Sequence, residues 1–244
     1  MKTDFKKTIP FILFMLVLAF SSGHCFKSYK KTNATVKEKV TPTVIVDAGH
    51  GGFDGGAVAL DGTEEKEINL LIALKLQKLL SDGKYKVIMT RTGDYATNDT
   101  GDKIRSKKRS DMQNRLALME ENPRGIFVSI HLNKYTTSSV SGAQVFYSPN
   151  DDLSKTLAEK LQQNFAVLQP ENKRTVKKGT SSAYLLYNAK IPAVIVECGF
   201  LSNKEELELL KKDDYQQKTA ECIKKGIDEY FKSFEKNGYS LDKT

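Results

Sequence analysis

Residues 44–56 read VIVDAGHGGFDGG, and this stretch decides the fold. Three β-branched apolar residues predict a buried strand, which five glycines and two aspartates then end abruptly. His50 stands where the strand stops. Two chemistries fit this pattern: a glycine loop that wraps phosphate, or a metal ligand at the carboxyl end of a strand. The phosphate loop fails because no Gly-Lys-Ser/Thr ending follows and the glycine spacing is not that of a dinucleotide loop.

Strand-like and helix-like segments alternate along the rest of the chain. Apolar β-type runs predict strands, and apolar residues three or four apart predict helices. This alternation predicts an α/β fold, a single layered domain with a mixed, mostly parallel β-sheet flanked by helices on both faces. Ligand sites in such sheets gather at the carboxyl ends of the strands. The predicted strands are 43–49, 84–91, 125–132, 142–148, 183–187 and 193–200, and the predicted helices are 66–83, a segment after the polar residues 92–108, 151–168 and two near the C-terminus.

The first 42 residues differ in composition from the rest. Lysines precede the apolar run TIPFILFMLVLAF, which is too short for a comfortable membrane span, so residues 1–26 are predicted to be a signal peptide or a signal anchor. Residues 27–42 lack apolar periodicity and predict a flexible tether. We expect a catalytic domain over residues 43–235 and a polar C-terminal tail over 236–244. The protein is therefore expected to be exported, with membrane contact only through its N-terminal segment.

The chain carries 38 basic and 30 acidic residues, a formal net charge of +8. On an exported protein this charge suits an anionic polymer such as the cell wall, or a membrane surface. Nucleic acid is not expected as a partner, because the basic residues are not interleaved with aromatic ones. Cys198 and Cys222 are the two cysteines beyond the leader; a disulfide between them is conceivable, but we expect two buried thiols.

Two histidines remain beyond the leader, His50 and His131, and each follows an apolar β-type run. A single histidine is usually structural, but two at strand ends predict a shared metal site, because imidazole is the commonest metal ligand. A catalytic zinc takes three protein ligands, so an acid is expected as the third. Glu64, Glu65 and Glu67 at the start of a predicted helix are the candidates, although acids there also favour the helix dipole. Spacing alone does not choose between Glu64 and Glu65.

Glu197 follows four apolar residues of a predicted strand, where a carboxylate is costly unless it is paired or at the strand end. It is either a member of a buried ion pair or turn cap, or a general base for a water molecule at the metal. Cys198 is its neighbour in sequence. Successive strand side chains point to opposite faces, so Cys198 is not expected to be a nucleophile or a ligand.

Four stretches, in order, resemble the zinc-dependent N-acetylmuramoyl-L-alanine amidases of the type 3 family. They are IVDAGHGGFDGGA, EKEINL, Arg115 followed by FVSIHLN, and IPAVIVECGFLSN. With the helices between and after them, the resemblance spans residues 43 to about 231. It implies a Zn²⁺ ion on His50, Glu65 and His131, since the family ligand is the glutamate directly before the lysine, and it implies Glu197 as the catalytic glutamate.

The reaction that the resemblance implies is hydrolysis of the amide bond between N-acetylmuramic acid and L-alanine in peptidoglycan. Glu197 would take a proton from water and return one to the alanine nitrogen. Arg115, Asn133 and Lys134 lie near the site in sequence and would orient the substrate, or would only make structural pairs. The alternatives are another cell-wall zinc peptidase of the carboxypeptidase kind, and a non-catalytic peptidoglycan-binding protein that depends on a partner.

Within the family, the short leader and the lack of wall-binding repeats most resemble the amidases of the spore cortex. Such enzymes remove the peptide from muramic acid on the way to the muramic-δ-lactam that germination enzymes recognise. The expected location is therefore secreted or membrane-anchored, at the cell wall or in the forespore intermembrane space. The region after Asn150 is too short for the long autoinhibitory insert of some division amidases, which implies constitutive access or an activating partner protein.

Overall fold

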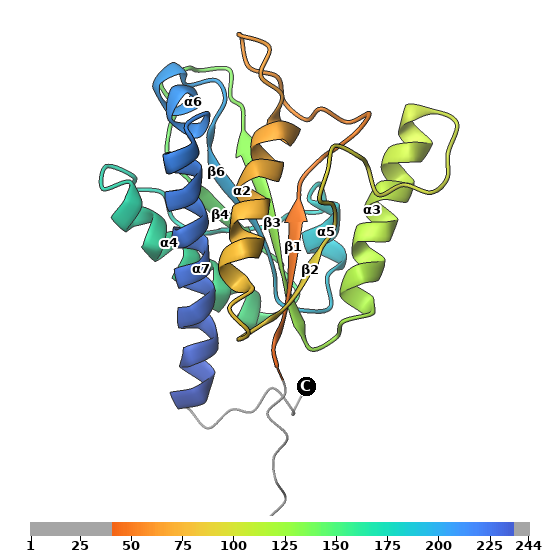
Figure 1. Ribbon diagram of the computed structural model, residues 1–244, viewed down its shortest axis with the longest axis vertical. Coiled ribbons are helices and arrows are strands. Elements are labelled where there is room, and N and C mark those ends of the chain that lie inside the picture. The colour runs from red at the N-terminus through yellow and green to blue at the C-terminus, as the bar shows by residue number, and fades with distance from the viewer. Residues whose placement is uncertain (1–40, 237–244) are drawn as a thin grey trace, which may run out of the picture. The chain divides into compact units, whose positions relative to one another are not determined.

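The computed structural model describes residues 41–236, without the side chains of residues 235 and 236 (Figure 1). Its elements are β1 (Thr43–Ala48), α2 (Glu65–Leu80), β2 (Lys86–Met89), α3 (Ile104–Glu120), β3 (Gly125–Asn133), β4 (Gln144–Tyr147), α4 (Asp152–Leu168), β5 (Lys177–Lys178), α5 (Tyr184–Asn188), β6 (Ala193–Phe200), α6 (Lys204–Leu210) and α7 (Asp213–Lys236). The strands form one sheet in the order β2-β1-β3-β6-β4-β5.

The sheet is mostly parallel, as predicted. Strands β2, β1, β3 and β6 are parallel neighbours, and β4 runs antiparallel to β6. The central strands β1 and β3 are largely buried on both faces because helices cover both sides of the sheet. Because β1, β3 and β6 are parallel, their carboxyl ends meet at one edge of the sheet. His50, His131 and Glu197 lie at or near these strand ends.

Alternation along β6 shows which face each side chain joins. Val196 and Cys198 belong to the larger apolar cluster, which α2, α4 and α7 cover. Ile195 packs against the smaller cluster, to which α3 and α5 contribute. Figure 1 shows α2 and α7 in front of the sheet and α5 behind it. By the period of two, Glu197 shares the α3/α5 face with Ile195, and Cys198 points away from it.

One predicted strand, residues 183–187 (AYLLY), is wrong: residues 184–187 lie in the helix α5, and Ala183 directly precedes it. A five-residue apolar run does not distinguish the two conformations. A strand would point Leu185 and Leu186 to opposite faces, whereas the helix buries both side chains in the smaller cluster. The helix also covers the face of the sheet that carries Glu197.

Helix α3 begins at Ile104, inside the polar stretch 92–108 after which the helix was predicted to start. The Ser106 hydroxyl accepts a hydrogen bond from the Lys103 N–H and donates one to the Lys103 carbonyl oxygen. These local bonds satisfy backbone groups of the first turn, and the charged side chains there are exposed to water. A polar sequence at residues 104–108 therefore does not prevent these residues from forming the first turn of the helix.

The predicted leader and all but the last two residues of the predicted tether lie outside the described residues. The predicted tail does too, apart from Lys236, the last residue of α7. Between residues 41 and 236, no helix combines the length and the apolar character needed to cross a membrane. Cys198 and Cys222 are both buried and unpaired in a disulfide, as expected.

Candidate metal centre

The three predicted ligands meet at the carboxyl edge of the sheet. His50 follows β1, His131 lies near the end of β3, and Glu65 is the first residue of α2. The two imidazole rings approach edge to face, with 4.9 Å between their centroids. One ligand atom from each of the three side chains lies within 4.8 Å of the other two, so a single cation can reach all of them.

The Glu65 carboxylate joins the two imidazoles. Its Oε2 lies 3.1 Å from His50 Nε2, and its Oε1 lies 2.9 Å from His131 Nδ1. The backbone N–H groups of Ala57 and Leu132 donate to the same carboxylate at 2.9 and 3.1 Å. Burial alone would raise the pKa of Glu65, but the two imidazoles hold it well below its usual range. This buried carboxylate is therefore charged and fixed in place, which metal binding requires.

Asp54 orients His50 from the far side of its ring. Asp54 Oδ2 lies 3.0 Å from His50 Nδ1, and Lys108 Nζ lies 2.9 Å from Asp54 Oδ1. A carboxylate on one ring nitrogen fixes the tautomer and turns the other nitrogen, here Nε2, towards a metal. Burial alone would lower the pKa of His50, but Asp54 and Glu65 raise it to about 9.

Glycines allow the loop to pass beside the ligands. A Cβ on Gly56 would lie 2.7 Å from both His50 Cδ2 and Glu65 Oε2. A Cβ on Gly49 would lie 2.3 Å from the His131 ring. His50 itself has a φ of 62°, a left-handed conformation that costs a side chain about 1–2 kcal/mol. The surrounding contacts must therefore hold His50 in this conformation.

Arg91 is one of those contacts. Its side chain is 1% exposed and donates Nε to the Ala48 carbonyl oxygen at 2.9 Å. Its Nη2 donates to the carbonyl oxygens of Gly49, at 3.0 Å, and Lys66, at 2.7 Å. Gly49 precedes His50 and Lys66 follows Glu65, so one guanidinium ties together the two segments that carry these ligands.

Arg115, a predicted substrate contact, is fully buried beneath the same loop. It pairs with Asp47 and Asp111, and its Nη2 donates to the His50 carbonyl oxygen at 2.8 Å. Burial alone would raise the pKa of Asp47, but the Arg115 charge helps to hold it below its usual range. The structure thus shows Arg115 supporting the His50 loop, and its contact with substrate stays a prediction.

Asn133 and Lys134 lie where β3 ends. Asn133 is half-buried, and its carbonyl oxygen accepts a hydrogen bond from the Leu201 N–H at 2.8 Å. Lys134 Nζ donates to the Val58 carbonyl oxygen at 2.7 Å. Contacts of these two residues with substrate also stay predictions.

Glu197 stands beside the three ligands. It is in register with His131 in the β3–β6 pairing, and within residues 41–236 its buried Oε2 has no hydrogen-bond partner. Burial, assisted by the negative charge of Glu65, raises the pKa of Glu197 to about 7, although the two histidines oppose the shift. A carboxyl group that takes up or releases a proton near neutral pH can act as base and then as acid.

The residues present fit a catalytic zinc ion. Two imidazole nitrogens and one carboxylate oxygen form a ligand set that catalytic zinc sites use, with a further position open to water or substrate. The ligand atoms converge from three separate segments, and Glu197 Oε2, unpartnered within residues 41–236, lies at the same edge of the sheet. These features together favour a metal-assisted hydrolysis over a purely structural cluster.

Three residues that support the ligands were not predicted from the sequence: Asp54, Asn69 and Arg91. Asn69 Nδ2 donates to Glu65 Oε1 at 3.1 Å and to the Gly49 carbonyl oxygen at 3.3 Å. Asp54 gave a readable signal, since a carboxylate close in sequence to a ligand histidine often orients it. Asn69 and Arg91 gave no comparable signal. Asn69 is a polar residue within a predicted helix, and Arg91 is a charged residue at the end of a predicted strand.

Comparisons with known proteins point to one enzyme family. The sequence model of a family described as N-acetylmuramoyl-L-alanine amidase matches residues 44–229. The germination-specific N-acetylmuramoyl-L-alanine amidase of Bacillus subtilis (strain 168) is 34% identical over 233 residues, which cover 92% of this chain and 94% of that protein. The structure of the CwlD amidase from Clostridioides difficile, solved in complex with the GerS lipoprotein, is 40% identical and matches with a TM-score of 0.75 over 79% of this chain and 99% of that one. The catalytic domain of CwlV, an N-acetylmuramoyl-L-alanine amidase from Bacillus (Paenibacillus) polymyxa var. colistinus, is 31% identical, with a TM-score of 0.67 over 78% and 98% of the two chains.

Proposed function

The chain belongs to the N-acetylmuramoyl-L-alanine amidase family and is an amidase that acts on peptidoglycan, and we propose that it does so with a zinc ion at the site described above. His50, Glu65 and His131 would hold the ion, and Glu197 would be the catalytic base. The observation that carries this proposal is the convergence of two imidazoles on one buried, charged carboxylate. Zinc in such a site polarises a carbonyl oxygen and makes a water molecule more acidic.

Glu197 would move the proton in this reaction. A carboxylate at this position can accept a proton from the attacking water and then donate one to the departing alanine nitrogen. Its Oε2, which has no hydrogen-bond partner among the described residues, can make both contacts, and β6 holds it opposite His131. Asp54 and Asn69 would keep the ligands aligned through His50 Nδ1 and Glu65 Oε1.

The choice of Glu65 as ligand can be tested against its neighbour. Glu65→Gln should reduce zinc affinity at least tenfold, because an amide is a poor zinc ligand and cannot balance the imidazoles. Glu64→Gln is the matched control, since Glu64 instead pairs with Lys66 at 3.3 Å on the surface. The measurement is the zinc dissociation constant by competition with a chelator. Equal affinities of the two variants would contradict this ligand assignment.

The role of Glu197 and the bond cleaved can be tested by product analysis. The purified chain, given zinc and peptidoglycan, should release peptides that begin with alanine, whereas a carboxypeptidase would release other products. Glu197→Gln should retain zinc and lose this release by a factor of about 10²–10⁴, the usual contribution of a general base. Retained release in Glu197→Gln would remove Glu197 from the mechanism. Chelation of the metal should stop release by the wild-type chain, and added zinc should restore it.

We propose further that the enzyme acts on the spore cortex, on the route to muramic-δ-lactam. The similarity to a germination-specific amidase supports this role. A strain that lacks the gene should make cortex without the lactam, which muropeptide analysis detects. Cortex with normal lactam content would contradict the proposal.

We also propose an activating partner protein, one that raises peptide release above the rate of the isolated chain, because the similar CwlD amidase was solved in complex with the GerS lipoprotein. Full turnover and tight zinc binding by the isolated chain would show that it needs no partner. The remaining proposals follow the composition of the termini: residues 1–26 direct export or anchor the chain, 27–42 form a tether, and 43–235 form the catalytic domain. Mass measurement of the exported protein would show whether the leader is removed.

A further inference from the structure

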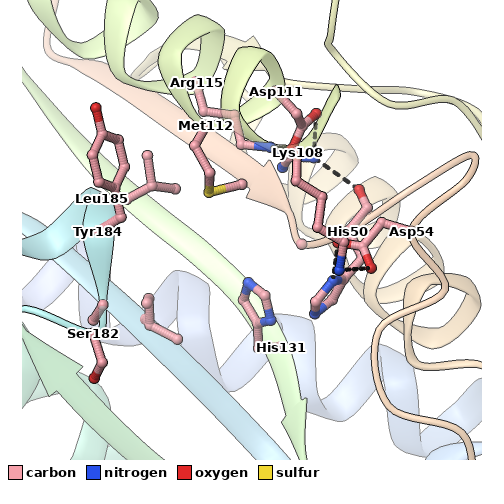
Figure 2. A pocket seen from close by; sticks show the side chains of 13 residues that line it. His50, Asp54, Lys108, Asp111, Met112, Arg115, His131, Ser182, Tyr184 and Leu185 are labelled. Carbon is pink, nitrogen blue, oxygen red and sulfur yellow. Dashed lines mark hydrogen bonds and ion pairs between the residues drawn. The ribbon is translucent and has the colours of Figure 1, made fainter. Parts of the chain in front are cut away.

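A cavity of about 320 Å³ extends from the metal centre along the α3/α5 face of the sheet. Figure 2 shows His50 and His131 at one end of it and Tyr184 of α5 at the other. Ile195 of β6 also lines the cavity, and it stands two residues before Glu197 on the same face of the sheet. A group held in this cavity lies beside the proposed base Glu197. The cavity is therefore suited to one of the two parts of the substrate that the cleaved amide bond joins, the muramoyl sugar or the peptide.

The charged groups that line this cavity are already paired within the protein. Lys108 pairs with Asp54 at 2.9 Å, and Arg115 pairs with Asp111 at 2.8 Å. The peptide half of the substrate brings at least one carboxylate, and burying a carboxylate is costly where no cation is available. The cavity is therefore better suited to an uncharged group than to the peptide.

The remaining lining matches an N-acetylated sugar. Met112 of α3, Leu185 of α5 and Ile195 of β6 give apolar walls. Ser182 adds a hydroxyl, and Tyr184 adds an aromatic ring that is 40% exposed. The methyl groups and ring C–H bonds of an N-acetylmuramoyl residue suit these walls and the tyrosine ring, while its hydroxyls suit the polar rim. The volume lies near the lower end of small-molecule sites, about 300–1,000 Å³, which suits one sugar residue.

The other side of Glu197 offers a cation. Gln144 of β4 is in register with Glu197, and Arg174 Nη1 donates to Gln144 Oε1 at 3.2 Å. The Arg174 guanidinium also lies 4.7 Å from the centroid of the Phe200 ring, which steadies its position. A fixed guanidinium on this side favours the half of the substrate that carries carboxylates.

We propose that the cavity between α3 and α5 binds the N-acetylmuramoyl sugar, with the ring of Tyr184 packed against it, and that the peptide leaves on the β4 side. This inference rests on the proposed function, because it takes the metal centre as the point of cleavage. In this proposal α5, whose residues were predicted from the sequence to form a strand, recognises the glycan.

The lack of tryptophan in the chain allows a direct test. Tyr184→Trp introduces a single indole at the cavity, and Tyr187→Trp introduces one on the same helix at a position that does not line it. Each full-length, zinc-loaded variant is titrated with the peptide-free disaccharide of N-acetylglucosamine and N-acetylmuramic acid, and separately with the dipeptide L-alanyl-D-glutamate. The indole emission reports which half of the substrate enters the cavity.

We expect a saturable emission change in Tyr184→Trp with the disaccharide and none with the dipeptide, while Tyr187→Trp responds to neither. Tyr184→Ala should raise KM about two- to tenfold, the range of an aromatic contact, with kcat nearly unchanged. A response to the dipeptide instead would place the peptide in this cavity. Equal emission changes in Tyr184→Trp and Tyr187→Trp would also overturn the proposal. So would no emission change with either compound at concentrations as high as those of peptidoglycan that saturate turnover.

The outcomes separate this proposal from the function on which it rests. The fluorescence titration needs no turnover, so it judges the sugar site even if the wild-type chain releases no alanine-terminated peptide. If the wild-type chain does release such peptides while the disaccharide leaves the emission of Tyr184→Trp unchanged, the proposed function is supported and the sugar site is refuted.

Discussion

Replacing Arg91 by lysine tests whether the buried guanidinium sets the spacing of two metal ligands. The guanidinium makes four hydrogen bonds to backbone carbonyl oxygens, of Ala48, Gly49, Lys66 and Gly93, at 2.7–3.0 Å. A lysine ammonium keeps the charge but places its donors at one point, so it can reach about half of these acceptors. At roughly 1–2 kcal/mol for each lost bond, Arg91→Lys should lower the free energy of unfolding by about 2–4 kcal/mol.

The zinc site should weaken in addition. Gly49 and Lys66 are the sequence neighbours of His50 and Glu65. When their carbonyl oxygens lose these hydrogen bonds, the two segments can move relative to each other, and the distance between the two ligands varies more widely. Changes in groups that orient metal ligands typically cost about 10–100-fold in affinity. We therefore expect the zinc dissociation constant of Arg91→Lys to rise by a factor in this range.

Two measurements separate the effects. Urea unfolding of the metal-free protein gives the stability loss, and chelator competition under native conditions gives the zinc dissociation constant. Arg109→Lys is the matched control, because Arg109 lies exposed on α3 and its replacement should change neither quantity appreciably. If Arg91→Lys loses stability but binds zinc within twofold of the wild type, Arg91 supports only the fold and the reasoning about ligand spacing is refuted.

Three further predictions follow from the buried groups. Because Arg115 helps to hold the folded-state pKa of Asp47 below its unfolded value, this carboxylate stabilises the fold above about pH 4, and the contribution is lost as the pH falls further. Urea titrations should therefore show a steeper loss of stability below pH 4 in the wild type than in Asp47→Asn, and equal slopes would contradict this. Asp54→Asn removes the charge that orients His50 and should weaken zinc binding about tenfold in chelator competition; an unchanged affinity would count against that role. Burial raises the pKa of Cys222 to about 12, so its thiol should resist alkylation at pH 8 until urea unfolds the protein, and rapid labelling of the native protein would disprove its burial.

The sequence by itself determined the strand-and-loop plan of the site. The β-branched run before His50 and the apolar run before His131 both predicted strands, and each histidine stands where its strand reaches the edge of the sheet. Alternation along β6 separated Glu197 from Cys198 correctly. These features are local: a strand has a period of two, and a glycine loop reflects how closely the backbone must pass the ligands.

The tertiary structure decided what depends on partners distant in sequence. Glu65 rather than Glu64 faces the histidines because α2 starts where Ala57 and Leu132 can donate to its carboxylate. Residues 184–187 lie in a helix because two adjacent leucines share one cluster on one face of the sheet. Arg91 matters because the fold brings together carbonyl oxygens 25 and 42 residues away from it. No sequence periodicity encodes such contacts, since each exists only after the strands have taken their order in the sheet.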